Sequence, residues 1–204
     1  MTRRGLTLIE LLITTAITAL TVGAVTSTMN AFSGAMQDHD AAADGTARIA
    51  RADVRLAEHL ERARMILAQD ADEVVLWLPT EPFTSSAGNT TDYDTIHANE
   101  LAWYVMDAAT GTLRLHYLAN RADRSTHALS TAWTSLRPIL ASQGKLATVQ
   151  VLEGLASGQF QIEDADACSV RRISFMGALK PSHGGMGVRL GGRLSNGQRH
   201  PDCP

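Results

Sequence analysis

The side chains of this sequence that could catalyse a reaction or bind a metal are scattered along its whole length. Its histidines fall in no HExxH or other zinc-ligand spacing: His39, His59, His97, His116, His127, His183 and His200. The chain also lacks a nucleophile elbow and a paired-carboxylate signature. The run GGMGVRLGG has no phosphate-loop lysine and no following helix, so it predicts a loop and an edge strand. We therefore expect no enzymatic activity and no cofactor.

Glu10 has the most unusual surroundings of any charged residue in the chain. It is the only charge in an apolar run that is otherwise uncharged as far as Asp38. A carboxylate in hydrocarbon costs roughly 2.5 kcal/mol or more even on lenient insertion scales, so Glu10 requires a partner. The simpler alternative is a glutamate that extends to the nearby membrane interface.

The segment around Glu10 predicts a membrane span. Residues 6–31 are apolar or small apart from Glu10, and at about 1.5 Å per residue they are long enough to cross a ~30 Å hydrocarbon core. Arg3 and Arg4 precede the segment, which predicts a cytoplasmic N-terminus and an exported remainder. A secretory signal peptide explains the arginines equally well. It does not explain the length of the run, the charge within it, or the position of the small residue Gly5 before it.

The run RRGLTLIELL resembles the class III prepilin signal of type IV pilins and type II secretion pseudopilins. The resemblance implies cleavage by a prepilin peptidase between Gly5 and Leu6, N-methylation of Leu6, and retention of the apolar segment in the mature protein. Two positions depart from the family pattern. Leu6 stands where phenylalanine is usual, and Ser27 stands where major pilins tend to carry a helix-bending proline.

This resemblance implies a partner for Glu10. The carboxylate of one subunit would neutralise the N-terminal amine of a neighbouring subunit at membrane depth and so set the axial register of assembly. In such families the extreme tip subunit commonly lacks this glutamate. Because this chain retains it, we expect a subunit that docks beneath another one at low copy number.

The same resemblance implies the location and the partners. We expect a single-pass inner-membrane protein whose N-terminus is cytoplasmic and whose globular domain is periplasmic until it enters a filament. The partners would be the major and other minor pseudopilins or pilins, the prepilin peptidase and methylase, and an inner-membrane assembly platform. A net charge of −3, from 18 basic and 21 acidic residues, gives no general electrostatic case for nucleic acid.

Apolar residues continue at helical spacing beyond the membrane segment. Ile49, Leu56, Leu60, Ala63 and Leu67 recur in steps of three, four and seven, which predicts one amphipathic helix to about residue 69. Asp44-Gly45 is a possible interruption. We expect a leader at 1–5, a membrane helix at 6–31, its periplasmic continuation at 32–69 and a globular β-rich domain at 70–204.

The rest of the chain reads as strands. The alternation in ELAWYVMDAATGTLRLHYL predicts a hairpin with its turn at residues 108–111. Further strands are expected at 73–79, 159–163, 170–176 and 188–194. The segment 125–155 stays ambiguous, with Pro138 breaking any long helix. A helix followed by a series of strands predicts an α+β fold, in which a long N-terminal helix packs against an antiparallel β-sheet domain, as in pilins.

A looser resemblance points to a subgroup. RIARADVRLAEHLERAR and AWYVMDAATGTLRLHY are similar to segments of minor pseudopilin J and pilin W-like subunits. This implies a structural role. The alternative is a tip-located subunit that binds exported substrate, a surface or DNA. An exposed patch of Trp77, Trp103 or Trp133 would favour that role, and so would a basic stripe built from Arg171, Arg172, Arg189, Arg193 and Arg199.

The resemblance to pilins points to roles for two features near the C-terminus. Cys168 and Cys203 could close a loop like the C-terminal disulfide loop of some type IV pilins. Some pseudopilins bind calcium in a C-terminal loop, which makes Asp164 and Asp166 calcium candidates. Because no EF-hand spacing is present, we expect a solvated turn there instead.

Overall fold

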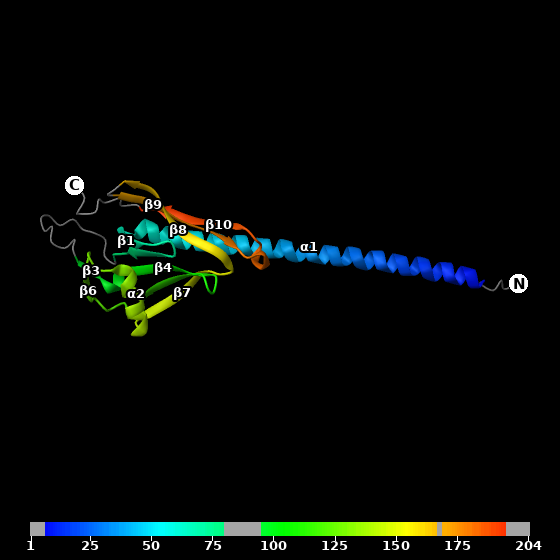
Figure 1. The fold of residues 1–204 in the computed structure, drawn as a ribbon, viewed down its shortest axis with the longest axis horizontal. Helices are drawn as coiled ribbons and strands as arrows, with labels where there is room; N and C mark the ends of the chain where they lie inside the picture. The colour runs from blue at the N-terminus through cyan, green and yellow to red at the C-terminus, as the bar shows by residue number, and fades with distance from the viewer. Residues whose placement is uncertain (1–6, 80–94, 167–168, 195–204) are drawn as a thin grey trace.

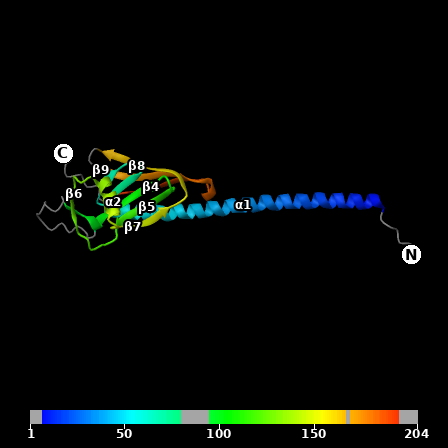
Figure 2. The same cartoon turned by 60° about the horizontal axis from the view of Figure 1, so that its bottom comes forward.

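The computed structural model places a long helix at one end of the molecule and a β-rich domain at the other (Figure 1). It describes residues 7–79, 95–166 and 169–194, with the backbone alone described at 95, 163–166 and 169–171. Helix α1 runs from Leu8 to Arg62, 55 residues, which is on the order of 80 Å at ~1.5 Å per residue. Its second half packs against the domain, and its first half projects away from it in both views (Figures 1 and 2).

Helix α1 is continuous across Asp44-Gly45, the possible interruption. Gly45 is buried, and a Cβ atom there would lie 2.8 Å from the carbonyl oxygen of His183 and 2.9 Å from Cε of Met186. The helix therefore uses glycine to let a loop of the domain close against its backbone. This packing offsets the ~1 kcal/mol that glycine costs inside a helix.

The prediction that the helix reaches residue 69 is wrong. α1 ends at Arg62, where the backbone of Ala63 becomes extended and its N–H donates to the carbonyls of the preceding turn. Strand β1 (Met65–Gln69) follows and pairs antiparallel with β2 (Glu73–Trp77). The apolar residues of this segment fit helical spacing, but strand pairing with β2 provides the backbone with hydrogen-bond partners that outweigh that local preference.

Five antiparallel strands form the main sheet in the order β1-β2-β4-β5-β7. The hairpin of β4 (Leu101–Asp107) and β5 (Thr112–Leu118) is confirmed. Asp107 Oδ1 accepts hydrogen bonds from the N–H groups of Ala109 and Thr110 at 3.1 and 3.2 Å, and Gly111 has a φ of 68°. The turn therefore depends on a side-chain acceptor and on glycine in the left-handed region. β7 (Leu146–Leu152) pairs with β5 and is one edge of the sheet.

A second sheet has the order β10-β9-β8. β8 (Leu155–Asp166), β9 (Ser169–Leu179) and β10 (Gly187–Arg193) confirm the three strands expected near the C-terminus. The remaining elements are short: β3 (Thr95–His97), η2 (Ala98–Glu100), β6 (Thr126–Ala128), α2 (Trp133–Ser142) and η3 (Pro181–His183). The ambiguous segment 125–155 thus holds β6, α2 and β7, and Pro138 lies inside α2, which is only ten residues long.

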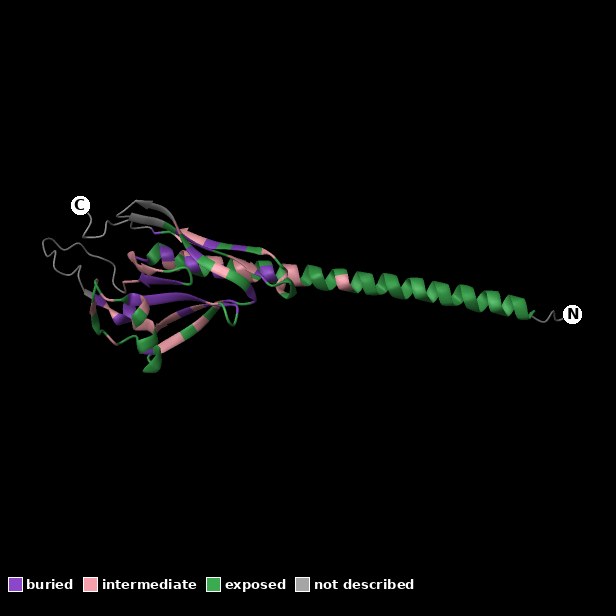
Figure 3. Cartoon of the chain, viewed as in Figure 1, coloured by how far each residue is buried: buried purple, intermediate pink, exposed green. Residues whose placement is uncertain are grey.

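The two faces of the main sheet bury separate cores (Figure 3). On one face α1 packs over both sheets, burying residues that include Leu56, Leu60, Tyr104, Phe175 and Leu190. On the other face α2 covers a second cluster that includes Val75, Trp77, Trp103, Val105 and Trp133. Arg137 of α2 donates to both carboxylate oxygens of the buried Glu73 on β2, at 3.0 and 3.1 Å. The architecture is α+β, with a long N-terminal helix packed against antiparallel sheet.

Candidate assembly surface

The first half of α1 exposes large apolar side chains all around its circumference. Every residue from 7 to 33 is exposed, and Leu8, Leu20 and Phe32 keep 76%, 75% and 67% of their surface accessible. Apolar surface of this extent marks an interaction with lipid or with other proteins. By length and composition the helix can cross a membrane, which is compatible with a single-pass anchor.

The threonine hydroxyls between residues 14 and 28 do not need water. Each of them donates to a backbone carbonyl three or four residues earlier, at 2.7 to 3.1 Å: Thr14, Thr15, Thr18, Thr21, Thr26 and Thr28. In the hydrocarbon core of a membrane an unsatisfied polar group costs several kcal/mol, as an unpaired backbone N–H or C=O group does. The threonine content of the segment is therefore no obstacle to membrane insertion.

Glu10 and Thr7 form a capping box at the start of α1. A Glu10 carboxylate oxygen accepts from the Thr7 N–H at 2.9 Å and from the Thr7 hydroxyl at 3.0 Å, and the Thr7 hydroxyl oxygen accepts from the Glu10 N–H at 3.4 Å. The sequence pattern Thr-x-x-Glu is a known signal for this motif, and the sequence reading missed it. The expected cleavage and methylation positions, Gly5 and Leu6, lie outside the described residues. The cap directs the Glu10 carboxylate toward the N-terminal end of the helix.

The second half of α1 is fixed to the domain through β10. Asp53 Oδ1 accepts a hydrogen bond from the Gly191 N–H at 3.0 Å. A Cβ atom on Gly192 would lie 3.2 Å from Cα of Ala57, so the strand and the helix approach closely there. β10 is an edge strand, as the glycine-rich run predicts, and α1 covers that edge. The projecting half of α1 and the domain are therefore coupled through a packed contact.

Several predicted site residues fall outside what the structure describes. Cys168 and Cys203 are among them, so their pairing stays a prediction. Asp164 and Asp166 lie in strand β8 and not in the turn expected there, and their side chains are not described. Among the side chains that the structure describes, no group of three His, Cys, Asp or Glu residues could hold a metal ion.

The aromatic patch that would favour a binding role does not form. Trp77, Trp103 and Trp133 retain 5%, 0% and 4% of their surface accessible and lie in the core beneath α2. The basic stripe forms in part, because Arg172 and Arg193 are register partners on neighbouring strands and both are exposed. Arg189 is exposed on the same face of β10, whereas Arg199 and the side chain of Arg171 are not described.

No family model matches this chain, and no curated protein matches it.

One titratable pair lies where α1 meets the sheet. The Tyr104 hydroxyl and His59 Nδ1 are 2.8 Å apart, and their rings meet edge to face. Burial lowers the pKa of His59, and the positive charge of Arg62 lowers it further. Burial also raises the pKa of Tyr104. His59 is therefore a neutral hydrogen-bond partner of Tyr104 near neutral pH.

We expect the free energy of unfolding to fall as the pH drops from about 7 to about 5. The unfolded chain protonates its histidines near pH ~6.5, whereas folded His59 resists protonation, so its contribution is present above that pH and is lost below it. His116 acts in the same direction because burial lowers its pKa too. Urea unfolding of the full chain in detergent at the two pH values measures the effect.

The His59→Gln variant should show a weaker pH dependence than the parent chain. His39→Gln is the matched control, because the His39 side chain is 85% exposed on α1. If the free energy of unfolding of His59→Gln depended on pH as strongly as that of the parent chain, His59 would not be a source of the effect.

Proposed function

We propose that this protein is a minor pilin-like structural subunit of a type II secretion pseudopilus or a type IV pilus, similar to the pseudopilin J or pilin W-like classes. The observation that carries the proposal is the continuity of α1, in which a fully exposed apolar half passes without a break into the half packed on the domain. A removable signal peptide needs no such continuity, whereas a subunit whose helix becomes the filament core does.

Assembly would transfer the apolar half of α1 from lipid to the helices of neighbouring subunits. Glu10 would exchange its contact with Thr7 for the N-terminal amine of a neighbour, so that the two charges neutralise each other where neither is solvated. The proposal places the mature N-terminus at Leu6, after cleavage behind Gly5. The protein would contribute contacts and axial register, with no chemical step of its own.

The proposal implies a defined cellular setting. The chain would sit in the inner membrane with a cytoplasmic N-terminus and a periplasmic domain, and would meet the prepilin peptidase, the assembly platform and other subunits there. Burial of all three tryptophans removes one of the two features that would favour a tip-located binding subunit, and the other, the basic stripe, forms in part.

Filament fractionation tests this role. The full chain would be expressed with a prepilin peptidase, an assembly platform with its ATPase, and a major subunit, and sheared filaments would then be separated from membranes. We expect the chain in the filament fraction only when the ATPase is active. Gly5→Leu, which blocks the expected cut, is the control and should stay in the membrane. A chain that remains wholly in the membrane fraction under all conditions would overturn the proposal.

A further inference from the structure

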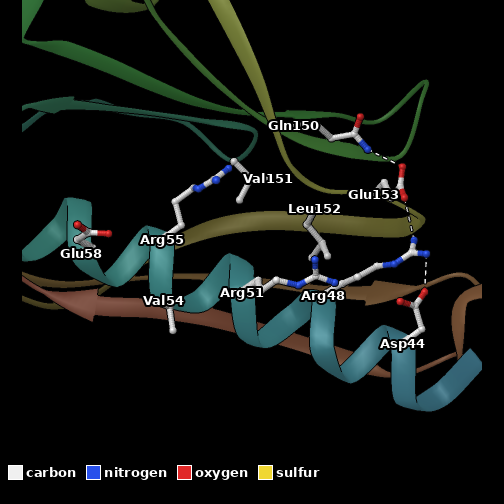
Figure 4. Close-up of a pocket in the computed structure, with 10 residues that line it drawn as sticks. All are labelled: Asp44, Arg48, Arg51, Val54, Arg55, Glu58, Gln150, Val151, Leu152 and Glu153. Carbon is white, nitrogen blue, oxygen red and sulfur yellow. Dashed lines mark hydrogen bonds and ion pairs between the residues drawn. The ribbon is translucent and has the colours of Figure 1, made fainter.

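A groove runs between α1 and the edge strand β7. Its larger part encloses about 670 Å³, and a second part of about 250 Å³ shares Arg55 with it and continues toward the end of α1. We call the two parts together the α1–β7 groove. Figure 4 shows Arg48, Arg51 and Arg55 projecting from α1 toward residues 150–153, with Val54 pointing away.

The arginines of the groove are not equally neutralised. Arg48 forms ion pairs with Asp44 and, at 2.8 Å, with Glu153. Arg51 donates to the Ala47 carbonyl at 3.2 Å, and neither it nor Arg55 forms an ion pair in the part of the chain that the structure describes. Two exposed guanidinium groups on one helix face thus point into the groove without an ion-pair partner among the described residues, and Glu58, which also lines the groove, is not paired with either. Carboxylates are their best-matched ligands.

The second part of the groove adds a buried acceptor. Asn99 is 6% exposed, and its Oδ1 has no hydrogen-bond partner among the described residues. Its amide nitrogen donates to the Arg121 carbonyl at 3.0 Å, which fixes the orientation of the side chain. Asn99 lines this part of the groove, and a buried acceptor without a partner is costly. Arg62 and Arg121 line the same part.

In the larger part of the groove, the wall opposite α1 is formed by residues 150–153, at the end of β7. β7 is the last strand in the order of the main sheet, so among the described strands it has a neighbour on one side only. Open N–H and C=O groups on such an edge accept an added strand. An extended peptide meets every requirement of the groove, because it offers backbone N–H groups as well as side-chain carboxylates.

We propose that the α1–β7 groove binds an extended, carboxylate-bearing segment of a neighbouring subunit, a partner that rests on the assembly role proposed above. Anionic lipid fits less well. Arg48 lies 17 residues beyond Ala31 (48 minus 31), which is about 25 Å along the helix at ~1.5 Å per residue. The groove is thus well clear of the expected membrane surface, and the partner is a protein of the filament.

The test uses the full chain in a nonionic detergent and a fluorescein-labelled octapeptide of alternating glutamate and valine. Fluorescence anisotropy should show saturable binding. The variant Arg51→Gln/Arg55→Gln should bind at least about tenfold more weakly, because both unpaired guanidinium groups are lost. Arg189→Gln/Arg193→Gln, which removes the same charge from β10, should bind within about twofold of the parent chain.

Two further peptides separate strand addition from plain charge attraction. A lysine–valine octapeptide should not bind. Glutamate–valine peptides N-methylated at every second residue, prepared in both registers, should include one that binds at least about tenfold more weakly, since methylation removes the N–H donors. Equal affinity for the groove variant and the parent chain would overturn the proposal, and so would full binding by both methylated peptides.

A second copy of the chain is the competing occupant. If the groove variant lowered self-association of the full chain while the peptide failed to bind, the groove would be a contact between copies and the proposal would be wrong. Peptide binding requires no filament, so its failure leaves the assembly role untouched. Conversely, a chain that binds the peptide but never enters filaments counts against the assembly role alone.

Discussion

Replacing Glu10 with alanine lowers incorporation of the chain into filaments at least about tenfold in our account, while membrane insertion and N-terminal processing stay unchanged. The alanine leaves a neighbouring N-terminal amine unpaired at membrane depth. A charge there costs about 2.5 to 3.5 kcal/mol on insertion scales, which exceeds the ~1.4 kcal/mol of a tenfold change. Quantifying the chain in sheared filaments and in membranes from the same cells measures the loss.

Two further variants separate the charge of Glu10 from its capping role. Glu10→Gln can still accept the hydrogen bond from the Thr7 N–H, so it retains the cap and loses only the charge. Thr7→Val retains the carboxylate and removes the hydroxyl that accepts from the Glu10 N–H. We expect Glu10→Gln to assemble as poorly as the alanine variant and Thr7→Val to assemble nearly as well as the parent chain. Normal assembly of Glu10→Gln would show that the charge has no role.

Replacing Trp103 with alanine should cost the domain about 3 to 5 kcal/mol of unfolding free energy. The Trp103 side chain is fully buried beneath α2, and its indole N–H donates to the Trp133 carbonyl at 3.2 Å. The alanine leaves a cavity in the second core and removes this hydrogen bond. Urea unfolding of the full chain in detergent, followed by the fluorescence of the remaining tryptophans, gives the difference.

Val54→Ala is the matched control for the core prediction. Val54 lies on α1 with 67% of its surface exposed, so its truncation should change stability by no more than about 0.5 kcal/mol. A loss from Trp103→Ala as small as that of the control would mean that α2 does not cover the sheet as described.

The hairpin and the long helix could be predicted because their signals are local. Alternation along 101–117 together with Gly111 specifies two paired strands and their turn, and the structure has both. The helix is encoded by an uninterrupted apolar run followed by amphipathic spacing, which continues through Gly45.

The end of the helix could not be predicted because a non-local contact determines it. Residues 65–69 carry apolar side chains that fit either a helix or a strand, and pairing with β2 decides between them. The sequence left burial of the tryptophans open for a related reason. Whether a strand face meets solvent depends on α2, a ten-residue helix with a proline inside it that the sequence left ambiguous.

The candidate surfaces also combine features that are visible in the sequence with contacts that only the fold creates. The apolar segment and Glu10 are visible in the sequence, and Thr7 could have been recognised from its spacing to Glu10. The contact between Asp53 and Gly191 spans 138 positions, and Asn99 lines the same part of the groove as Arg62 and Arg121. Only the folded chain brings such groups together.

The N-terminus of the mature protein tests the central claim most directly. Intact mass and N-terminal sequence would be measured on the full chain extracted from membranes, expressed with and without a prepilin peptidase. The account predicts a chain that begins at N-methylated Leu6 only when the peptidase is present. A product that begins beyond Ala31, or one that keeps residues 1–5 regardless of the peptidase, would contradict it.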